Sequence, residues 1–410
     1  MPTAELYDLG FELRIVPFAL VAHVSSFLIL AYLELITLSS FWGPPHLDNS
    51  TARSIVFLHT LWISVLIVLQ RVRIRAVVIE RKKIMPKAIR MYETGGPEVL
   101  RWEEYDPGRP GHGDVLLRHE AVGLNFIDVY HRTGLYPLPA FPATPGMEGA
   151  GIVEEIGEGV AEVAPGDRVA YAGLPPGAYS QIRIIPAHRL VKLPEDISTR
   201  QAAAMMLQGM TARYLLRGCY KVSSGDTILI HAAAGGVGSI VCQWAKHLGA
   251  TVIGTVGSQE KSELARGNGC DHPVIYTRED FVERVKEITR GKGVDVVYDS
   301  VGYPTFMKSL DCLRPMGMMV SFGQSGGPVP PLDTGILAAK GSLFMTRPSL
   351  MTYTARREDL LAHARDLFEV VQQGIVHIRV PQTYPLSEAA RAHRDLEERK
   401  TTGSSVLLPS

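Results

Sequence analysis

The chain has 410 residues, which is too many for one ordinary domain and fits two domains with an additional N-terminal segment. Its 42 Lys and Arg residues balance its 42 Asp and Glu residues, so the net charge of zero gives no overall attraction to nucleic acid. The cysteines form no C-x-x-C pair and no secretory disulfide spacing, a pattern typical of reduced, mostly buried thiols in a cytosolic-type compartment: Cys219, Cys242, Cys270 and Cys312.

The first 84 residues differ in composition from the rest of the chain. Two largely apolar runs without Asp, Glu, Lys or Arg, Ile15–Leu33 and Ser54–Gln70, are each close to the length that crosses a bilayer. The basic cluster Arg71–Lys83 would keep the downstream chain on the cytoplasmic side, but the first run ends at Glu34 and the second is short. Three interpretations remain open: a two-helix membrane hairpin, a targeting segment, or a reading frame that begins ahead of a working protein starting near Met85.

From Lys87 the pattern changes to short alternating strands separated by Gly and Pro, which is typical of a small, barrel-like β domain. The predicted strands cover residues 87–91, 114–121, 151–156, 168–171 and 179–185. Ser198–Leu216 is predicted to be a helix that leads into a second, doubly wound part.

That second part begins with a strand, a turn of small residues and a helix. The apolar strand Ile228–Ile230 runs into the turn Ala232–Gly238, and a second strand, Thr251–Val256, follows the helix. Free backbone N–H groups at such a helix N-terminus can bind a pyrophosphate. The turn matches G-x-G-x-x-G at Ala233, Gly235 and Gly238, with Ala in the first place, so the sequence predicts a dinucleotide site.

The end of the second strand carries no carboxylate to accept a hydrogen bond from a ribose 2′-hydroxyl. It reads Gly257-Ser258-Gln259-Glu260-Lys261, where Ser258 and Lys261 could donate to a 2′-phosphate. The sequence therefore favours NADP(H) over NAD. The alternative is that Lys261 only solvates the start of a helix.

Further helices are predicted over residues 281–289, 306–313 and 357–373, and strands over 294–298, 318–322, 342–346, 381–385 and 404–408. Ser300 follows the strand 294–298, and Phe322 ends the strand 318–322 just before Gly323–Ser325, so these residues are predicted to lie on the rim of the sheet where a dinucleotide binds. The last strands are expected to return the C-terminus to the first domain.

Motifs along residues 85–409 jointly resemble the NADPH:quinone oxidoreductases, the zinc-free, zeta-crystallin-like members of the medium-chain dehydrogenase/reductase superfamily. They are Gly95-Gly96-Pro97-Glu98-Val99-Leu100, Gly123-Leu124-Asn125-Phe126-Ile127-Asp128, Gly134-Leu135-Tyr136-Pro137, Pro165-Gly166-Asp167-Arg168-Val169, Ala232 to Gly238, Tyr298-Asp299-Ser300-Val301-Gly302 and Gly403-Ser404-Ser405. The resemblance implies an α/β protein with a GroES-like β domain (residues 85–210 and 349–410) and a Rossmann NADP-binding domain with a parallel sheet (211–348). The hydrophobic N-terminal helical extension (1–84) is expected from its apolar runs alone and lies outside the family pattern.

The resemblance also implies chemistry without a metal. Zinc relatives carry a ligand Cys early in the β domain and a Gly-His-Glu motif, whereas this chain reads Asn125-Phe126-Ile127-Asp128 and Gly146-Met147-Glu148. Asn, Met and one Glu are a poor ligand set for Zn²⁺. A quinone is already electrophilic, so its reduction by NADPH needs mainly proximity and donors near the developing oxyanion.

The same resemblance implies the site residues. Asn125, Tyr130 and Tyr136 are the catalytic candidates, with Asn125 and Tyr136 favoured for polarising a quinone oxygen. The implied cofactor-binding residues are Phe126, Ile127, Asp128, Thr211, Tyr214, Ala233, Gly235, Gly236, Val237, Gly238, Gly257, Ser258, Lys261, Tyr276, Ser300, Phe322, Gly323, Gln324, Ser325, Pro348, Ser349 and Arg399.

Several of these residues also have a structural interpretation. The tyrosines Tyr130, Tyr136 and Tyr214 could be half-buried packing residues, and Asp128 could cap a helix. Arg168 is expected to tie down a turn. His131 is expected to be a surface residue.

The expected function is thus NADPH-dependent quinone reduction by a cytoplasmic homodimer. Reduction of activated C=C bonds in enals or enones is the nearest alternative. A non-catalytic NADPH-binding structural or RNA-binding protein is a third, although the balanced charge argues against RNA as a partner.

Overall fold

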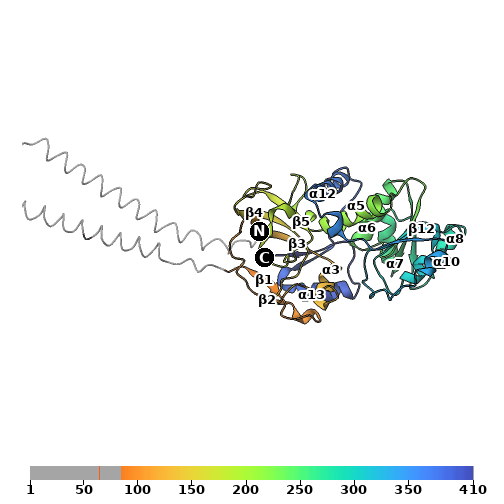
Figure 1. Ribbon diagram of the computed structural model, residues 1–410, viewed down its shortest axis with the longest axis horizontal. Helices are drawn as coiled ribbons and strands as arrows, with labels where there is room; N and C mark the ends of the chain where they lie inside the picture. Colours follow the sequence, from red (N-terminus) through yellow and green to blue (C-terminus); the bar gives the residue numbers. More distant parts are fainter. Residues whose placement is uncertain (1–63, 65–84, 410) are drawn as a thin grey trace, which may run out of the picture. The chain divides into compact units, whose positions relative to one another are not determined.

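The computed structural model describes residue 64 and residues 85–409 (Figure 1). The two apolar runs of the N-terminal segment, apart from Ser64, lie outside the described residues, and so does the predicted helical extension. Within the described part, no helix is both long enough and apolar enough to cross a membrane.

The first sheet belongs to the predicted β domain. Six of its strands run in the order β14-β15-β3-β4-β5-β7, β6 pairs with β3, and β1 and β2 form a separate hairpin. The bounds are β1 Lys87–Arg90, β2 Arg101–Glu104, β3 Asp114–Leu124, β4 Glu148–Ile156, β5 Arg168–Ala172, β6 Ile182–Pro186, β7 Val191–Lys192, β14 Gln382–Pro385 and β15 Ser405–Leu408. Short 3₁₀ turns at Pro97–Val99, Ala187–Arg189 and Leu386–Glu388, with α3 (Phe126–Thr133) and α13 (Ala389–Glu397), complete this part.

The C-terminal strand does return to this sheet, as the sequence predicts. β15 pairs antiparallel with the end of β3, with Val406 opposite Gly123 and Leu407 opposite Val122. This pairing explains why β3 runs to Leu124, three residues beyond its predicted end, since the partner strand lies far away in sequence.

The second sheet has six strands in the order β10-β9-β8-β11-β12-β13, and all its neighbouring strands are parallel. The strands are β8 Thr227–Ile230, β9 Thr251–Val256, β10 His272–Ile275, β11 Val294–Asp299, β12 Leu313–Ser321 and β13 Phe344–Thr346. Its helices are α6 Gly236–His247, α7 Gln259–Gly267, α8 Phe281–Ile288, α9 Phe306–Leu310 and α10 Gly335–Ala339.

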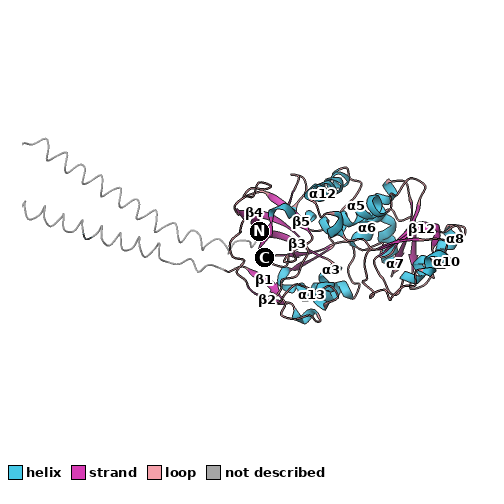
Figure 2. Cartoon of the chain, viewed as in Figure 1, coloured by secondary structure: helices cyan, strands magenta, loops and turns pink. Residues whose placement is uncertain are grey.

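Helices cover both faces of this sheet (Figure 2), and the side chains of β8 point alternately to one face and the other. Ile228 and Ile230 belong to a buried cluster with residues of α5, α6 and α12, whereas Leu229 belongs to another with residues of α8 and α9. Helices on both faces of a parallel sheet define a doubly wound Rossmann fold. The predicted fold class is confirmed, while the exact domain boundaries stay a prediction.

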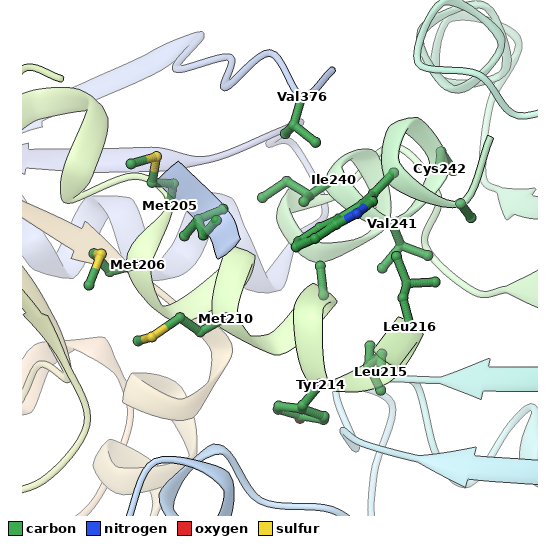
Figure 3. Close-up of a cluster of buried hydrophobic side chains, with 14 of the residues drawn as sticks. Met205, Met206, Met210, Tyr214, Leu215, Leu216, Ile240, Val241, Cys242 and Val376 are labelled. Atoms are coloured by element: carbon green, nitrogen blue, oxygen red, sulfur yellow. The ribbon is translucent and has the colours of Figure 1, made fainter. Parts of the chain in front are cut away.

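The predicted helix 198–216 is wrong as one piece. It is divided into α4 (Thr199–Ala202), α5 (Met206–Tyr214) and a π-helical turn (Leu215–Cys219). The break has a long-range cause: the buried Glu148 carboxyl of β4 accepts a hydrogen bond of 2.8 Å from the backbone N–H of Leu207 and so caps the start of α5. Figure 3 shows α5 beside α6, and both helices contribute to one buried cluster, with Met210 and Tyr214 from α5 and Ile240 and Val241 from α6.

The predicted boundary between helix 306–313 and strand 318–322 is also wrong. α9 ends at Leu310, and β12 begins at Leu313 because Leu313 pairs with Val294 of β11. The remaining helices are α11 (Leu350–Tyr353) and α12 (Arg357–Gln372), and α12 matches its prediction within one residue.

Candidate active site

The glycine turn leaves backbone groups bare at the start of α6. Gly235 is the N-cap of α6, and no side chain caps this helix end. Among the described residues, no acceptor receives the N–H groups of Gly236 and Val237. A Cβ on Gly238 would lie 2.2 Å from the carbonyl oxygen of Ala232, so only glycine fits where the helix meets the turn. This geometry suits an anionic group at a helix N-terminus.

The end of β9 gathers donors from three segments. Ser258 caps α7 by accepting a hydrogen bond of 3.2 Å from the N–H of Lys261. The Lys261 ammonium donates to the carbonyl oxygen of Arg399 at 2.6 Å, and the Arg399 guanidinium donates to the Tyr276 hydroxyl at 3.0 Å. Burial, followed by the charge of Arg399, lowers the pKa of Lys261. The structure therefore brings four predicted residues together beside Gly257 without a carboxylate partner for the two cations.

The rim of the sheet meets helix α3 through one hydrogen bond. The backbone N–H of Gln324, just after β12, donates to the Tyr130 hydroxyl at 3.0 Å. Gly323 is held close to Ser300, because a Cβ at Gly323 would lie 2.7 Å from the Ser300 carbonyl oxygen. Ser325 is also tied to Ser300, by an N–H to carbonyl bond of 3.0 Å. These predicted residues thus form one continuous edge that faces Tyr130.

Three aromatic rings lie together on α3 and the loop after it. The ring of Tyr130 is 5.1 Å from that of Tyr136 in an edge-to-face contact and 6.2 Å from that of Phe126. Burial raises the pKa of Tyr130 to about 12, so this phenol stays protonated across the neutral range. Phe126, Ile127 and Tyr136 keep part of their surface open.

Sequence reasoning missed Arg347, which lies directly after β13. Its guanidinium donates to the Tyr136 hydroxyl at 3.1 Å and to the carbonyl oxygens of Ser321 (3.2 Å) and Gly323 (3.0 Å). The available signal was a basic residue at the carboxyl end of a strand, next to the predicted Pro348-Ser349 turn. Of that turn, Pro348 is half-buried and Ser349 is exposed as the N-cap of α11.

Asn125 lies in a polar network whose other members sequence reasoning also missed. Only 5% of Asn125 is exposed. Its amide nitrogen donates to Glu148 at 2.7 Å, and its amide oxygen accepts from Gln208 at 3.0 Å. Burial raises the pKa of Glu148 to about 8, against the opposing effect of the bonds that it accepts. No local sequence signal connects Gln208 with Asn125, since 83 residues separate them.

Asp128 is fully buried and acts as a cap, which fits its structural interpretation, while its role in cofactor binding stays a prediction. It forms a capping box at the start of α3, where its carboxylate accepts from the Asn125 N–H at 2.9 Å. The Tyr179 hydroxyl also donates to it, at 3.1 Å. Burial raises the pKa of Asp128 to about 7.

His131 is likewise not a surface residue, because only 5% of it is exposed. The prediction that Arg168 ties down a turn is confirmed. Its guanidinium donates to the carbonyl oxygens of Glu195 (3.2 Å) and Ile197 and so holds the turn at residues 195–197.

Thr211, Tyr214 and Ala233 are buried, with 5%, 3% and 0% of their surface exposed. The Tyr214 ring stacks on Tyr353 with centroids 4.7 Å apart and planes inclined by 8°. The packing interpretation therefore fits Tyr214 well.

Within the described residues, no group of three or more His, Cys, Asp or Glu side chains could hold a metal ion. The cysteines are all free thiols, and three of them, Cys242, Cys270 and Cys312, are buried.

Comparison with known proteins agrees with this geometry. The profile of the alcohol dehydrogenase GroES-like domain matches residues 111–195, and that of the zinc-binding dehydrogenases matches residues 236–366. A quinone oxidoreductase of Pseudomonas aeruginosa is 51% identical over 325 residues, which cover 79% of this chain and 100% of that protein. A 2-haloacrylate reductase from Burkholderia is 49% identical over 334 residues, covering 79% of this chain and 99% of the relative.

Among solved structures, the Escherichia coli quinone oxidoreductase in complex with NADPH matches with a TM-score of 0.78 and 49% identity, covering 79% of this chain and 100% of that one. The chain therefore belongs to the quinone oxidoreductase family of the medium-chain dehydrogenase/reductase superfamily.

Proposed function

We propose that this protein is an NADPH-dependent quinone reductase that works without a metal. The observation that carries the proposal is the cluster of Ser258, Lys261, Tyr276 and Arg399 at the end of β9, where two cations lie where an NAD enzyme would place a carboxylate. Such donors suit a 2′-phosphate. The relatives named as quinone oxidoreductases and the NADPH complex of one of them support the same conclusion.

The residues present fit NADPH. The N–H groups of Gly236 and Val237, at the helix start that Gly238 packs closely against the turn, would hold the pyrophosphate. The edge formed by Ser300, Phe322 to Ser325 and Pro348 would lie along the nucleotide, and Tyr130, Tyr136, Phe126 and Ile127 would line the acceptor side. Bound NADPH supplies a hydride, or its electrons, to the acceptor.

The side chains of this chain would then orient the acceptor and stabilise charge on its oxygen. The Tyr136 hydroxyl accepts from Arg347 at 3.1 Å, so its own proton is left to point at an acceptor oxygen. Tyr130 similarly accepts from Gln324 and keeps its proton at neutral pH. We propose these tyrosines and the Asn125 amide as the groups that polarise a quinone.

Reduction of an activated C=C bond is the second candidate. Arg347 places an exposed guanidinium at Tyr136, and such a group could also pair with a carboxylate on an acidic enoate. The 2-haloacrylate reductase relative acts on that kind of molecule by its name. Nothing in the described residues favours a non-catalytic role.

We further propose a homodimer in the cytoplasm. β13 is an edge strand, and its Phe344 and Met345 are 58% and 38% exposed, beside Met316 of β12 at 63%. An edge strand with apolar side chains is a natural site for antiparallel pairing with a second copy. Sedimentation of the wild type and of Phe344→Asp tests this assembly.

The experiment for the activity is a panel of acceptors with purified full-length protein. NADPH oxidation should rise well above its background with quinones, and NADH should replace NADPH poorly. Faster turnover with enones or 2-haloacrylates than with any quinone would favour the second candidate. No acceptor-dependent oxidation with either class would refute both.

A further inference from the structure

Four buried polar side chains form a single chain of hydrogen bonds behind the site. The Ser404 hydroxyl donates to Gln208 Oε1 at 2.6 Å, Gln208 Nε2 donates to Asn125 Oδ1 at 3.0 Å, and Asn125 Nδ2 donates to Glu148 Oε2 at 2.7 Å. Their exposed fractions are 3%, 7%, 5% and 0% in that order. The chain joins the segment before β15 with helix α5, the start of α3 and strand β4.

The direction of this chain is fixed at its acidic end. Glu148 Oε1 accepts from the backbone N–H of Leu207 at 2.8 Å, and a backbone donor cannot be turned into an acceptor. When Glu148 is ionised, Oε2 can only accept, so the Asn125 amide then presents its nitrogen to Glu148 and its oxygen to Gln208. Gln208 must then present its nitrogen to Asn125 and its oxygen to Ser404. One carboxylate thus orders two amides.

The backbone is shaped around the chain at both ends. A Cβ on Gly123 would lie 2.2 Å from Glu148 Oε2, and a Cβ on Gly236 would lie 2.2 Å from Gln208 Oε1. Gly236 is the first residue of α6, so Gln208 packs directly against the turn that is proposed to bind the pyrophosphate. Gly403, next to Ser404, donates its N–H to the carbonyl of Ala234 in the same turn at 2.9 Å.

We propose that Glu148 and Gln208 are positioning residues that hold the Asn125 amide with its nitrogen as the donor for the reaction. This inference rests on the proposed function, because it assigns the reductase site its oriented amide. Asn125 Nδ2 carries two hydrogens and Glu148 accepts one of them. The second is the donor that serves the acceptor oxygen or the nicotinamide amide. Reversal of the chain would replace this donor by an oxygen.

The substitution Glu148→Gln reverses the donors and acceptors along this chain of hydrogen bonds and leaves every group with a partner. The Leu207 N–H requires an oxygen acceptor, so the new amide turns its nitrogen toward Asn125, and Asn125 and Gln208 must both flip. Measured at about pH 9, where Glu148 is ionised in the wild type, kcat should fall by about 10- to 100-fold, the loss typical of a misplaced oxyanion donor. The dissociation constant for NADPH and the Tm should stay close to those of the matched variant Glu155→Gln, an exposed glutamate of the same strand.

The double variant Glu148→Gln/Gln208→Glu separates the effect of the Asn125 amide orientation from the effect of lost structural support. Here the new carboxylate at position 208 accepts from both Ser404 and Asn125, so every hydrogen bond is satisfied and the net charge is unchanged, yet Asn125 still points the wrong way. We expect a wild-type Tm and, at saturating NADPH, a kcat as low as in Glu148→Gln. The affinity for NADPH should fall, because the new carboxylate lies beside the turn proposed to bind the pyrophosphate. Recovery of kcat in the double variant would overturn the proposal, because the network would then be only structural. A wild-type kcat in Glu148→Gln would overturn it as well.

The orientation of the Asn125 amide can also be measured without turnover, so it can be tested separately from the proposed function. The side-chain amide signals of Asn125 in asparagine-labelled protein should shift in both variants, since Nδ2 changes its hydrogen-bond partner from a carboxylate at position 148 to the residue at position 208. If the wild type reduces neither quinones nor activated alkenes, the proposed function fails while these signals still report the orientation. Unshifted signals in both variants would refute the positioning role directly.

Discussion

The guanidinium of Arg347 donates to the hydroxyl of Tyr136 at 3.1 Å and to the backbone oxygen of Gly323 at 3.0 Å. Arg347 follows a strand of the parallel sheet, whereas Tyr136 follows helix α3 of the β domain. One side chain therefore connects the rim of the nucleotide-binding sheet with an aromatic residue on the acceptor side. A cation in this place can order both sides of the site.

The first prediction tests this connection. Replacing Arg347 by Met should lower kcat/KM for quinones by about tenfold, because Tyr136 loses the donor that fixes its hydroxyl. Tyr136→Phe, which removes the hydroxyl itself, should lower it at least as much, and the double variant should be no worse than Tyr136→Phe. A double-mutant cycle on kcat/KM should yield a coupling energy of about 0.5–3 kcal/mol. Arg365→Met, which removes an exposed arginine of α12, is the control, and strictly additive effects would contradict the coupling.

The elements that sequence reasoning found are those specified by local pattern. The strand, glycine turn and helix around Gly235 follow from apolar spacing and small residues, and β9 has the predicted bounds. The break before α5 could not be found this way, because its cause is Glu148 on a distant strand. The partners of Asn125 were missed for the same reason. The roles of these residues, and of Asp128, depend on their burial. Burial is a property of the whole fold, so local sequence does not show it.

The second prediction concerns the choice of cofactor. Lys261→Ala and Arg399→Ala should each raise the KM for NADPH by about 10- to 100-fold, as expected for loss of a charge-assisted bond to a 2′-phosphate. The KM for NADH, which lacks that phosphate, should change little. Steady-state kinetics with both cofactors measure this, with the exposed Lys292→Ala as the control. Equal losses for NADPH and NADH would mean that these residues support the fold and do not select the phosphate.

The third prediction concerns the buried Tyr130. Its phenol has a pKa raised to about 12 by burial, so it cannot serve as a base at neutral pH. Tyr130→Phe removes the acceptor of the Gln324 N–H, and we expect kcat to fall by about three- to tenfold with no change in the shape of the pH–rate profile. A limb of the profile between about pH 6 and pH 10 that disappears in this variant would show that Tyr130 titrates after all.

The fourth prediction separates two glycines of neighbouring helices. Gly238→Ala places a Cβ 2.2 Å from a backbone oxygen and 2.8 Å from the Cα of Ala233, so we expect a loss of about 1–3 kcal/mol in the free energy of unfolding. Gly267→Ala at the end of α7 meets nothing within 4 Å and should be neutral or stabilise by up to about 1 kcal/mol. Urea unfolding of the two variants measures both effects. Equal stability of the two would contradict the close approach in the glycine turn.

The last prediction is a fall in stability as the pH rises from 6.5 to 8. Burial raises the pKa of Glu148 from 4.5 to about 8 and that of Asp128 from 3.8 to about 7. A carboxyl with a raised pKa binds its proton in the folded state but not in the unfolded state within this window. Its contribution to stability is therefore complete below the unfolded pKa and disappears as the pH passes the folded pKa.

The buried histidines act in the opposite direction, but at lower pH. Burial lowers the pKa of His119 and His393 from 6.5 to about 3, so their contribution is lost as the pH falls below 6.5. Between pH 6.5 and 8, the change in the free energy of unfolding therefore comes mainly from these two carboxyls. Urea unfolding across it should give a declining free energy for the wild type and a shallower decline for Glu148→Gln, whose neutral amide cannot titrate. Glu155→Gln should keep the wild-type slope, and an unchanged slope in Glu148→Gln would place the proton elsewhere.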